Sequence, residues 1–145
     1  MPSNPIALPE IRYIEEVLQA DREAIFTMLN DHNQRNGPPP SYRPFALLLR
    51  SAEDKTIGGL YGRTSYDWLF IEALVVPEQL RHLRLGHTLM DQAEAIARQR
   101  NCVGIWLDTF SFQALGFYQK LGFTEFGRLE DRPRGYTHHF MQKRL

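Results

Sequence analysis

The sequence predicts one α/β (α+β) domain, in which helices flank a mixed, mostly antiparallel sheet. Apolar runs of strand length alternate with amphipathic stretches of helix length along the 145 residues. Hydrophobic residues make up 43% and charged residues 23% of the chain, which is typical of a folded globular protein. A chain of this length can bury a core without a metal or a disulfide. We therefore expect a single domain over residues 1–145.

The N-terminal half is expected to contain one helix and four strands. Ile11–Ile14 can begin a strand, and Asp21 is a good N-cap for a helix that ends before Gly37, where three prolines follow. The next three strands are expected over residues 45–49, 56–66 and 68–76, with turns at 52–55 and at Asp67.

The C-terminal half is expected to contain two helices and three strands. Residues 86–99 have the apolar spacing of an amphipathic helix, and residues 102–107 are a short buried strand. Ser111 can cap a second helix whose apolar stripe ends before Gly122, a residue suited to a helix C-terminus. Two closing strands are expected over residues 123–129 and 137–143.

Charge and composition exclude several classes of function. Lys plus Arg equals Asp plus Glu at 17 each, whereas a nucleic-acid binder has a basic excess, so no nucleic-acid partner is expected. Zero net charge leaves a homodimer open. The single cysteine, Cys102, and the lack of a signal-peptide pattern or a membrane-length apolar run indicate a cytoplasmic protein without a membrane partner. His138 and His139 point to opposite faces of a strand and no zinc-type spacing occurs, so no metal is expected.

Residues 76–87 connect a strong strand to a helix, which aims free backbone N–H groups at one point. Arg81 and Arg84 add two full positive charges to this segment. It therefore has the features of an anion-binding loop, although a solvated loop would carry the same residues. Neither the dinucleotide-binding nor the Walker glycine pattern is present.

Two motifs carry a resemblance to a known family. Arg81–Gly86 (RHLRLG) resembles the coenzyme A loop Q/R-x-x-G-x-G/A of the Gcn5-related N-acetyltransferases, with Arg84 where the first glycine usually stands. Ala114–Phe123 (ALGFYQKLGF) is similar to the A-x-x-F-Y-x-K-x-G-F segment of the same family. The order of the predicted elements matches that family along roughly residues 10–145.

The resemblance implies a sheet of about six to seven strands with a splay between two central parallel strands. It also implies an acetyl-CoA-dependent N-acetyltransferase that acetylates a primary amine directly. The main chain of the strand before the loop would hold the pantetheine arm, and the loop would hold the pyrophosphate. Ser111 stands where the family often has an asparagine. The implied cofactor-binding residues are Leu74, Val75, Val76, Arg81, His82, Leu83, Arg84, Leu85, Gly86, His87, Ser111, Phe117 and Tyr118.

Two catalytic roles follow from the resemblance. Tyr118 matches the family tyrosine that protonates the leaving thiolate, although its apolar stripe also fits mere packing. Glu72 is expected to deprotonate the amine, and strand alternation would place it on one face with Leu74. An ion pair with Arg63 is the structural alternative for Glu72, and Asp108 is the competing carboxylate.

We expect a small-molecule amine as the acceptor, bound by segments 33–42, 61–68 and 131–136, which supply aromatic side chains. Alternatives are a non-catalytic acyl-CoA-binding or interaction domain on the same fold and a protein or peptide N-acetyltransferase. A nucleotide-binding domain that uses the same loop is a further alternative.

Overall fold

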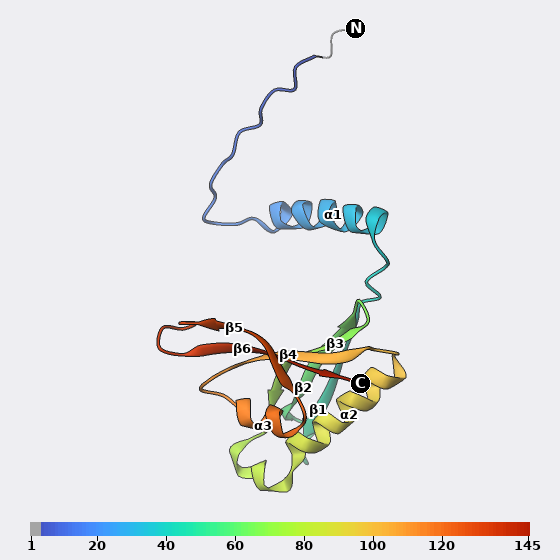
Figure 1. The fold of residues 1–145 in the computed structure, drawn as a ribbon, viewed down its shortest axis with the longest axis vertical. Helices are drawn as coiled ribbons and strands as arrows, with labels where there is room; N and C mark the ends of the chain where they lie inside the picture. The colour runs from blue at the N-terminus through green and yellow to red at the C-terminus, as the bar shows by residue number, and fades with distance from the viewer. Residues whose placement is uncertain (1–3) are drawn as a thin grey trace. The chain divides into compact units, whose positions relative to one another are not determined.

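The structure is a computed structural model that describes residues 4–145. The chain divides into two compact units, residues 1–39 and 40–145 (Figure 1). The single domain expected over residues 1–145 therefore stays a prediction. The helices and strands, in chain order, are α1 (Gln19–Asn36), β1 (Arg43–Arg50), β2 (Thr56–Ser65), β3 (Trp68–Val75), η1 (Glu78–Leu83), α2 (Leu85–Gln99), β4 (Gly104–Phe110), α3 (Leu115–Lys120), β5 (Thr124–Glu130) and β6 (Thr137–Arg144).

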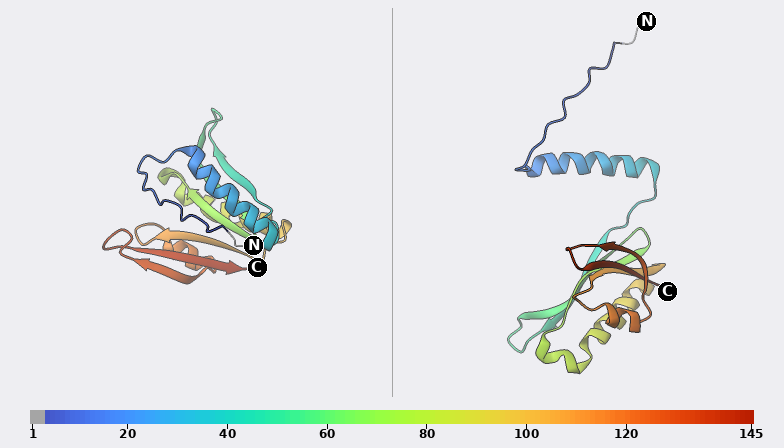
Figure 2. Two further views of the ribbon diagram at one scale, coloured as in Figure 1. Left: turned by 90° about the horizontal axis from the view of Figure 1, so that it is seen from above. Right: turned by 60° about the vertical axis from the view of Figure 1, so that its left-hand side comes forward.

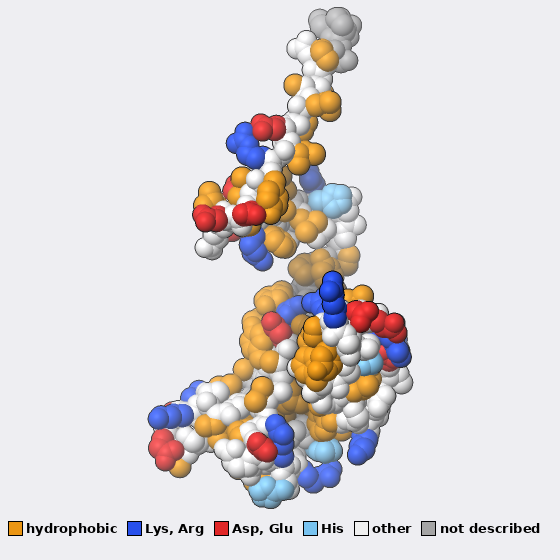
Figure 3. All heavy atoms as spheres, turned by 90° about the vertical axis from the view of Figure 1, so that its left-hand side faces the viewer, with side chains coloured by type: hydrophobic (Ala, Val, Ile, Leu, Met, Phe, Trp, Pro, Cys, Tyr) orange, Lys and Arg blue, Asp and Glu red, His pale blue; other side chains and the backbone are white. Residues whose placement is uncertain are grey.

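The N-terminal unit contains helix α1, which buries none of its own residues. Hydrophobic side chains lie along the surface of this unit (Figure 3). The predicted strand at Ile11–Ile14 is wrong, because a strand needs a partner for its backbone groups and residues 4–39 form no strand. The predicted N-cap is also wrong, since Leu18 holds that position and its carbonyl accepts the N–H of Asp21 at 3.1 Å. Asp21 lies in the first turn, where its carboxylate interacts favourably with the helix dipole.

The second unit is built on one six-stranded sheet with the order β1-β2-β3-β4-β6-β5. Only β3 and β4 run parallel, and every other neighbouring pair is antiparallel, so the predicted mixed sheet is confirmed (Figure 1). The turn predicted at Asp67 is confirmed as well. Tyr66 and Asp67 have φ of 47° and 68°, the left-handed pair that matches a tight hairpin to the twist of its strands.

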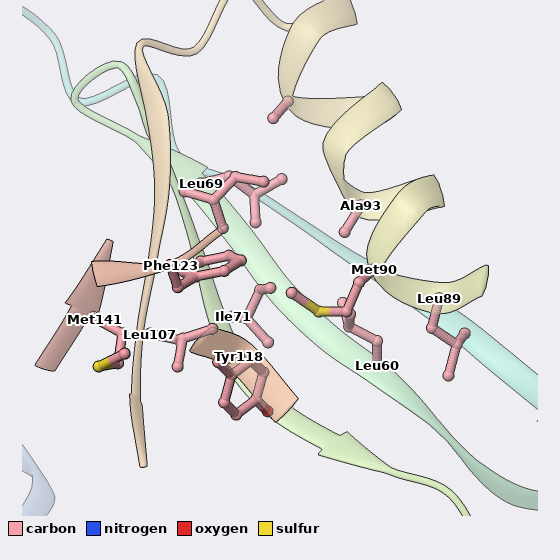
Figure 4. Packing of buried hydrophobic residues seen from close by; sticks show 12 residues of the cluster. Leu60, Leu69, Ile71, Leu89, Met90, Ala93, Leu107, Tyr118, Phe123 and Met141 are labelled. Atoms are coloured by element: carbon pink, nitrogen blue, oxygen red, sulfur yellow. The ribbon is translucent and has the colours of Figure 1, made fainter. Parts of the chain in front are cut away.

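Helices α2 and α3 cover one face of this sheet (Figure 2). The α2 stripe places Leu89, Met90, Ala93 and Ala97 against the strands, and all four are buried. The strands contribute aliphatic side chains at alternate positions, of which Leu107 is 1% exposed (Figure 4). Burial of each such leucine stabilises the fold by roughly 1.5–3 kcal/mol. Core strand residues in this cluster are Leu60, Leu69, Ile71, Ile105, Leu107 and Met141.

The two parallel strands are paired along only half of their length. Their register runs from Trp68↔Gly104 to Ile71↔Leu107, and beyond it the strands part. This separation is the splay that the family resemblance implied.

A bulge in β3 lies where the splay begins. Tyr61 pairs with Ala73 and Gly62 with Ile71, so Glu72 is left without a partner on β2. The bulge shifts the alternation by one residue, and Leu74 therefore faces the same side as Ile71. The prediction that Glu72 and Leu74 share one face is wrong.

Helix α3 is shorter than expected and begins at Leu115 after an N-cap at Ala114. The predicted Ser111 cap is wrong, because its hydroxyl accepts the backbone N–H of Thr137 at 3.0 Å. The glycine predicted at the other end is confirmed, since Gly122 has φ of 92° directly after the helix.

Candidate active site

A cavity of about 840 Å³ opens where β3 and β4 part. Its walls come from the end of β3, the end of β4, the start of α2 and the segment that leads into α3. The lining residues are Ile71, Glu72, Ala73, Leu74, Val75, Val76, Arg81, Arg84, Gly86, His87, Leu107, Asp108, Thr109, Phe110, Phe112, Gln113, Ala114, Phe117 and Tyr118.

The β3 wall offers an unpaired strand edge. On its outer side β3 stays bonded to β2, where Leu74 pairs with Leu60 and Val75 with Gly59. On its inner side no partner follows Ile71. The backbone groups of the inner edge are therefore available to a ligand that binds as an extra strand.

The second wall is the turn from η1 into α2. Arg84 stands between these helices with φ of 57° and ψ of 28°, the left-handed conformation that glycine adopts most readily. This conformation costs a residue with a side chain roughly 1–2 kcal/mol. The backbone at this position has the shape that a glycine would give it, and both Arg84 and Arg81 line the cavity.

Gly86 shows why α2 starts so close to α3. A Cβ atom at this position would lie 3.2 Å from Cζ of Phe117, which is tighter than ordinary packing. The missing side chain lets the first turn of α2 approach Phe117, whose ring also meets that of His87 edge-on at 5.2 Å. The unpaired N–H groups of this first turn carry the positive end of the helix dipole.

Four of the predicted cofactor-binding residues do not line the cavity. They are His82, Leu83, Leu85 and Ser111. Leu83 is 53% exposed, and the Ser111 hydroxyl is occupied by the Thr137 N–H. The structure brings the other predicted site residues together around one cavity.

Tyr118 lies at the base of the cavity and is 8% exposed. Its ring meets those of Phe117 and Phe123 at 5.2 and 6.0 Å, and Figure 4 shows its hydroxyl at the edge of the core cluster. Burial, together with the negative charge of Asp108, raises the pKa of Tyr118 to about 12. The phenol therefore keeps its proton at neutral pH and can donate it.

Two carboxylates line the cavity from different strands. Glu72 is ion-paired with Arg63, whose Nη1 lies 3.3 Å from Oε2 and whose guanidinium stacks on Phe70. The structural alternative considered for Glu72 is therefore present. Asp108, at the end of β4, has His138 Nε2 at 3.4 Å from its Oδ1.

Four cavity residues between Asp108 and α3 were not singled out from the sequence: Thr109, Phe110, Phe112 and Gln113. Gln113 Oε1 accepts the Phe110 N–H at 2.8 Å and the Thr109 hydroxyl at 3.2 Å, which fixes the turn after β4. Phe112 stacks on Phe110 at 5.1 Å. The available signal was topological, because ligands gather beyond the carboxyl ends of parallel strands.

Within residues 4–145, no three His, Cys, Asp or Glu side chains gather where they could hold a metal ion. No helix in the described part of the chain is long and apolar enough to cross a membrane.

Comparison with known proteins agrees with this geometry. The family model for the acetyltransferase (GNAT) family matches residues 11–123. Acetyltransferase Atu2258 of Agrobacterium fabrum is 32% identical over 133 residues, which cover 91% of this chain and 97% of that protein. Blasticidin-S acetyltransferase of Streptomyces morookaense is 39% identical over 115 residues, covering 77% of this chain and 85% of that protein.

A solved structure shares the whole architecture. The crystal structure of an acetyltransferase from Bacillus cereus is 34% identical, with a TM-score of 0.83, and the match covers 92% of this chain and 98% of that one. The resemblance carried by the two sequence motifs is thereby confirmed. This chain belongs to the acetyltransferase (GNAT) family, and it is an acyltransferase.

Proposed function

We propose that this chain transfers an acetyl group from acetyl-CoA directly to a primary amine of a small molecule. The observation that carries the proposal is one cavity, in which an unpaired strand edge, two arginines at a helix start and a protonated tyrosine converge. These three features match three groups of acetyl-CoA, which are the pantetheine arm, the pyrophosphate and the sulfur that leaves as the thiolate.

Acetyl-CoA would bind with its pantetheine arm along the inner edge of β3, at the main chain of Leu74, Val75 and Val76. Its pyrophosphate would lie at the start of α2, where backbone N–H groups, Arg81 and Arg84 supply positive charge. His82, Leu83, Leu85 and Ser111 do not line the cavity, so contacts with acetyl-CoA are proposed for the other predicted residues only.

The chemistry requires a neutral amine, whose lone pair attacks the thioester carbon and expels the CoA thiolate. Tyr118 would donate its proton to this thiolate. Glu72 and Asp108 both line the cavity, and either carboxylate would take a proton from the amine. Burial raises the pKa of the Cys102 thiol, which opposes a covalent acetyl-enzyme at this residue and favours direct transfer.

The relative that acts on blasticidin S supports a small-molecule acceptor. Aromatic side chains also gather beside the cavity, where Tyr136 meets Phe112 edge-on at 5.2 Å. Segment 131–136 was one of the three segments expected to bind the acceptor. Such rings would hold a planar or cationic group next to the carboxylates.

The cofactor can be tested by thermal unfolding with acetyl-CoA, with ATP and NAD as controls. A ligand at about 100 times its dissociation constant adds about 2.7 kcal/mol. For a chain of this size that should raise the midpoint by about 5–15 °C. A shift with ATP or NAD but none with acetyl-CoA would contradict the proposal.

Turnover can then be followed as release of free CoA thiol, with blasticidin S as the first acceptor and a panel of primary amines after it. We expect Tyr118→Phe to lower kcat about 10²-fold without weakening acetyl-CoA binding, because only the proton donor is lost. Tyr13→Phe, at a side chain that is 82% exposed and outside the segments expected to bind the acceptor, is the matched control and should keep full activity. Equal activity of both variants would remove Tyr118 from the mechanism.

A further inference from the structure

His138 is a buried imidazole without a hydrogen-bond partner among the described residues. Its side chain is 6% exposed, and neither Nδ1 nor Nε2 is bonded. On β6 the ring stacks on Phe110 at 4.3 Å and lies against Phe140 at 4.5 Å. Packing on two aromatic rings needs no nitrogen atoms, and leaving polar atoms unpaired in a protein interior is unfavourable. The imidazole therefore calls for a role that a phenyl ring would not fill.

The charged side chain next to the His138 imidazole is Asp108. Nε2 of His138 lies 3.4 Å from Oδ1 of Asp108, while Asp108 also lines the cavity. The charge of Asp108 acts on Tyr118 in the same cavity. Asp108 therefore stands between the space where the amine must lose its proton and a buried group that can accept one.

No other charged side chain in residues 4–145 lies within ion-pairing distance of His138. In the sheet register, His138 lies opposite Phe110 on β4 and opposite Leu129 on β5. The charged residues of β5 are Glu125, Arg128 and Glu130. Glu125 and Arg128 bond to each other, and Glu130 pairs with Thr137, so its side chain points to the opposite face from His138.

Glu72 has no comparable arrangement. Its Oε2 is ion-paired with Arg63, and half of its side chain is exposed to solvent. The two carboxylates of the cavity thus have different neighbours. Glu72 is ion-paired with an arginine, whereas Asp108 lies next to an unbonded imidazole.

We propose that His138 is a positioning residue that receives, through Asp108, the proton given up by the acceptor amine. The proposal rests on the proposed acetyl transfer. An N–H bond of the ammonium breaks and its proton passes to Asp108, and the Asp108 proton passes to Nε2 of His138. The charge left on the pair is then a carboxylate beside an imidazolium, which attract each other.

The remaining atoms balance with the groups already described. The free amine lone pair forms the C–N bond to the acetyl carbon, and the C–S bond breaks. The CoA thiolate takes the proton of Tyr118. The acetylated nitrogen still carries one proton too many, and this second proton of the original ammonium passes to the Tyr118 oxygen. His138 then releases its proton to solvent through Asp108, so that each turnover yields one amide, one thiol and one proton.

The test compares two adjacent histidines on opposite faces of β6. His138→Gln removes the relay, whereas His139→Gln removes an imidazole that is bonded to Glu125 at 2.8 Å and lies away from Asp108. Both variants and wild type are assayed for kcat/KM against pH with the best acceptor from the amine panel. We expect His138→Gln to lower kcat/KM at neutral pH by about 10–10²-fold and to move the acidic limb of the profile to lower pH by at least about one unit. His139→Gln should leave the acidic limb in place.

A second variant and a second measurement separate a relay from mere packing. His138→Phe keeps a ring between Phe110 and Phe140, so it should unfold near the wild-type temperature, bind acetyl-CoA and still show the reduced rate. Nitrogen-15 imidazole spectra of the acceptor-free protein should show a His138 titration that moves in Asp108→Asn and stays unchanged in Glu72→Gln. The spectra need no acceptor.

The outcomes distinguish the two levels of the argument. A wild-type chain that neither binds acetyl-CoA nor acetylates any amine overturns the proposed function, and this proposal with it. A wild-type chain that is active, together with an unchanged pH profile in His138→Gln, overturns the relay alone. A His138 titration that is unchanged in Asp108→Asn also overturns the relay alone.

Discussion

The parallel strands β3 and β4 have two halves that differ in almost every property. In the first half, from Trp68↔Gly104 to Ile71↔Leu107, the strands are paired, and Leu69, Ile71 and Leu107 are all buried in the core. In the second half the strands part, and most of their residues that line the cavity are exposed or half-exposed, although Thr109 is buried.

The difference shows where this fold supplies binding capacity. Backbone groups that would have closed a ladder are left free at the point where β3 is bulged and helix α2 begins. The paired half holds the strands at a fixed separation, and the splayed half offers the free groups to a ligand. Stability and binding are therefore expected to respond to different positions on the same two strands.

The largest expected effect is on the paired half. Leu107→Ala should lower the free energy of unfolding by about 2–5 kcal/mol, because the side chain is 1% exposed and leaves a cavity in the core. Val75→Ala, on the splayed half, should change it by less than about 0.5 kcal/mol, since Val75 is 58% exposed. Urea unfolding of both variants measures the contrast, and equal losses would break the comparison.

The next effect concerns the proton on Tyr118. Burial raises its pKa to about 12, so the folded state keeps a proton that an unfolded tyrosine loses near pH 10. Stability from this group is thus complete below about pH 10 and falls as the pH rises toward 12, by about 2–3 kcal/mol in total. Urea unfolding of wild type and Tyr118→Phe gives the free energy of unfolding at each pH. The difference between the two proteins should be constant below about pH 9, and the two curves of free energy against pH should converge or cross above pH 10. Parallel curves throughout would mean that the phenol titrates normally.

A smaller effect is expected at the mouth of the splay. Arg84→Gly should raise the free energy of unfolding by up to about 1 kcal/mol, because glycine adopts φ of 57° without strain. It should also raise the KM for acetyl-CoA several-fold, since a cation near the phosphates is lost. Asn101→Gly, at φ of 58° outside the cavity, is the control and should leave the KM unchanged. An unchanged KM in Arg84→Gly would mean that the guanidinium does not contact the cofactor.

The smallest effect is expected at the bulge itself. Arg63→Gln removes the ion pair with Glu72, which is half exposed, so the unfolding free energy should fall by less than about 1 kcal/mol. The loss should shrink further in high salt. Arg50→Gln breaks an exposed pair with Asp54 and serves as the reference. A loss well above that of the reference would assign the bulge a structural role.

Features with local causes were predictable from the sequence. The hairpin at Asp67 and the glycine after α3 depend on residues within one turn, and both lie where they were expected. The cavity wall around Arg81 and Tyr118 followed from two motifs. Helix ends were less predictable, because a hydroxyl such as that of Ser111 can bond either to its own helix or to a distant strand.

Features with non-local causes were not predictable. The bulge that turns Glu72 away from Leu74 is set by the register of β2 against β3. The approach of His138 to Asp108 is set by the register of β4 against β6, and no spacing in the sequence encodes it. Both features decide which carboxylate has which partner.

The turn at Gly122 connects the end of α3, where Tyr118 lies, to the start of β5. The N–H of Gly122 bonds to the carbonyl of Gln119, and the N–H of Phe123 bonds to the carbonyl of Tyr118, both at 3.1 Å. Tyr118 is thereby tied by its own backbone to the turn that starts β5. The end of α3, Tyr118 and the start of β5 are thus joined by the same backbone hydrogen bonds, so a change in this turn is expected to move the phenol.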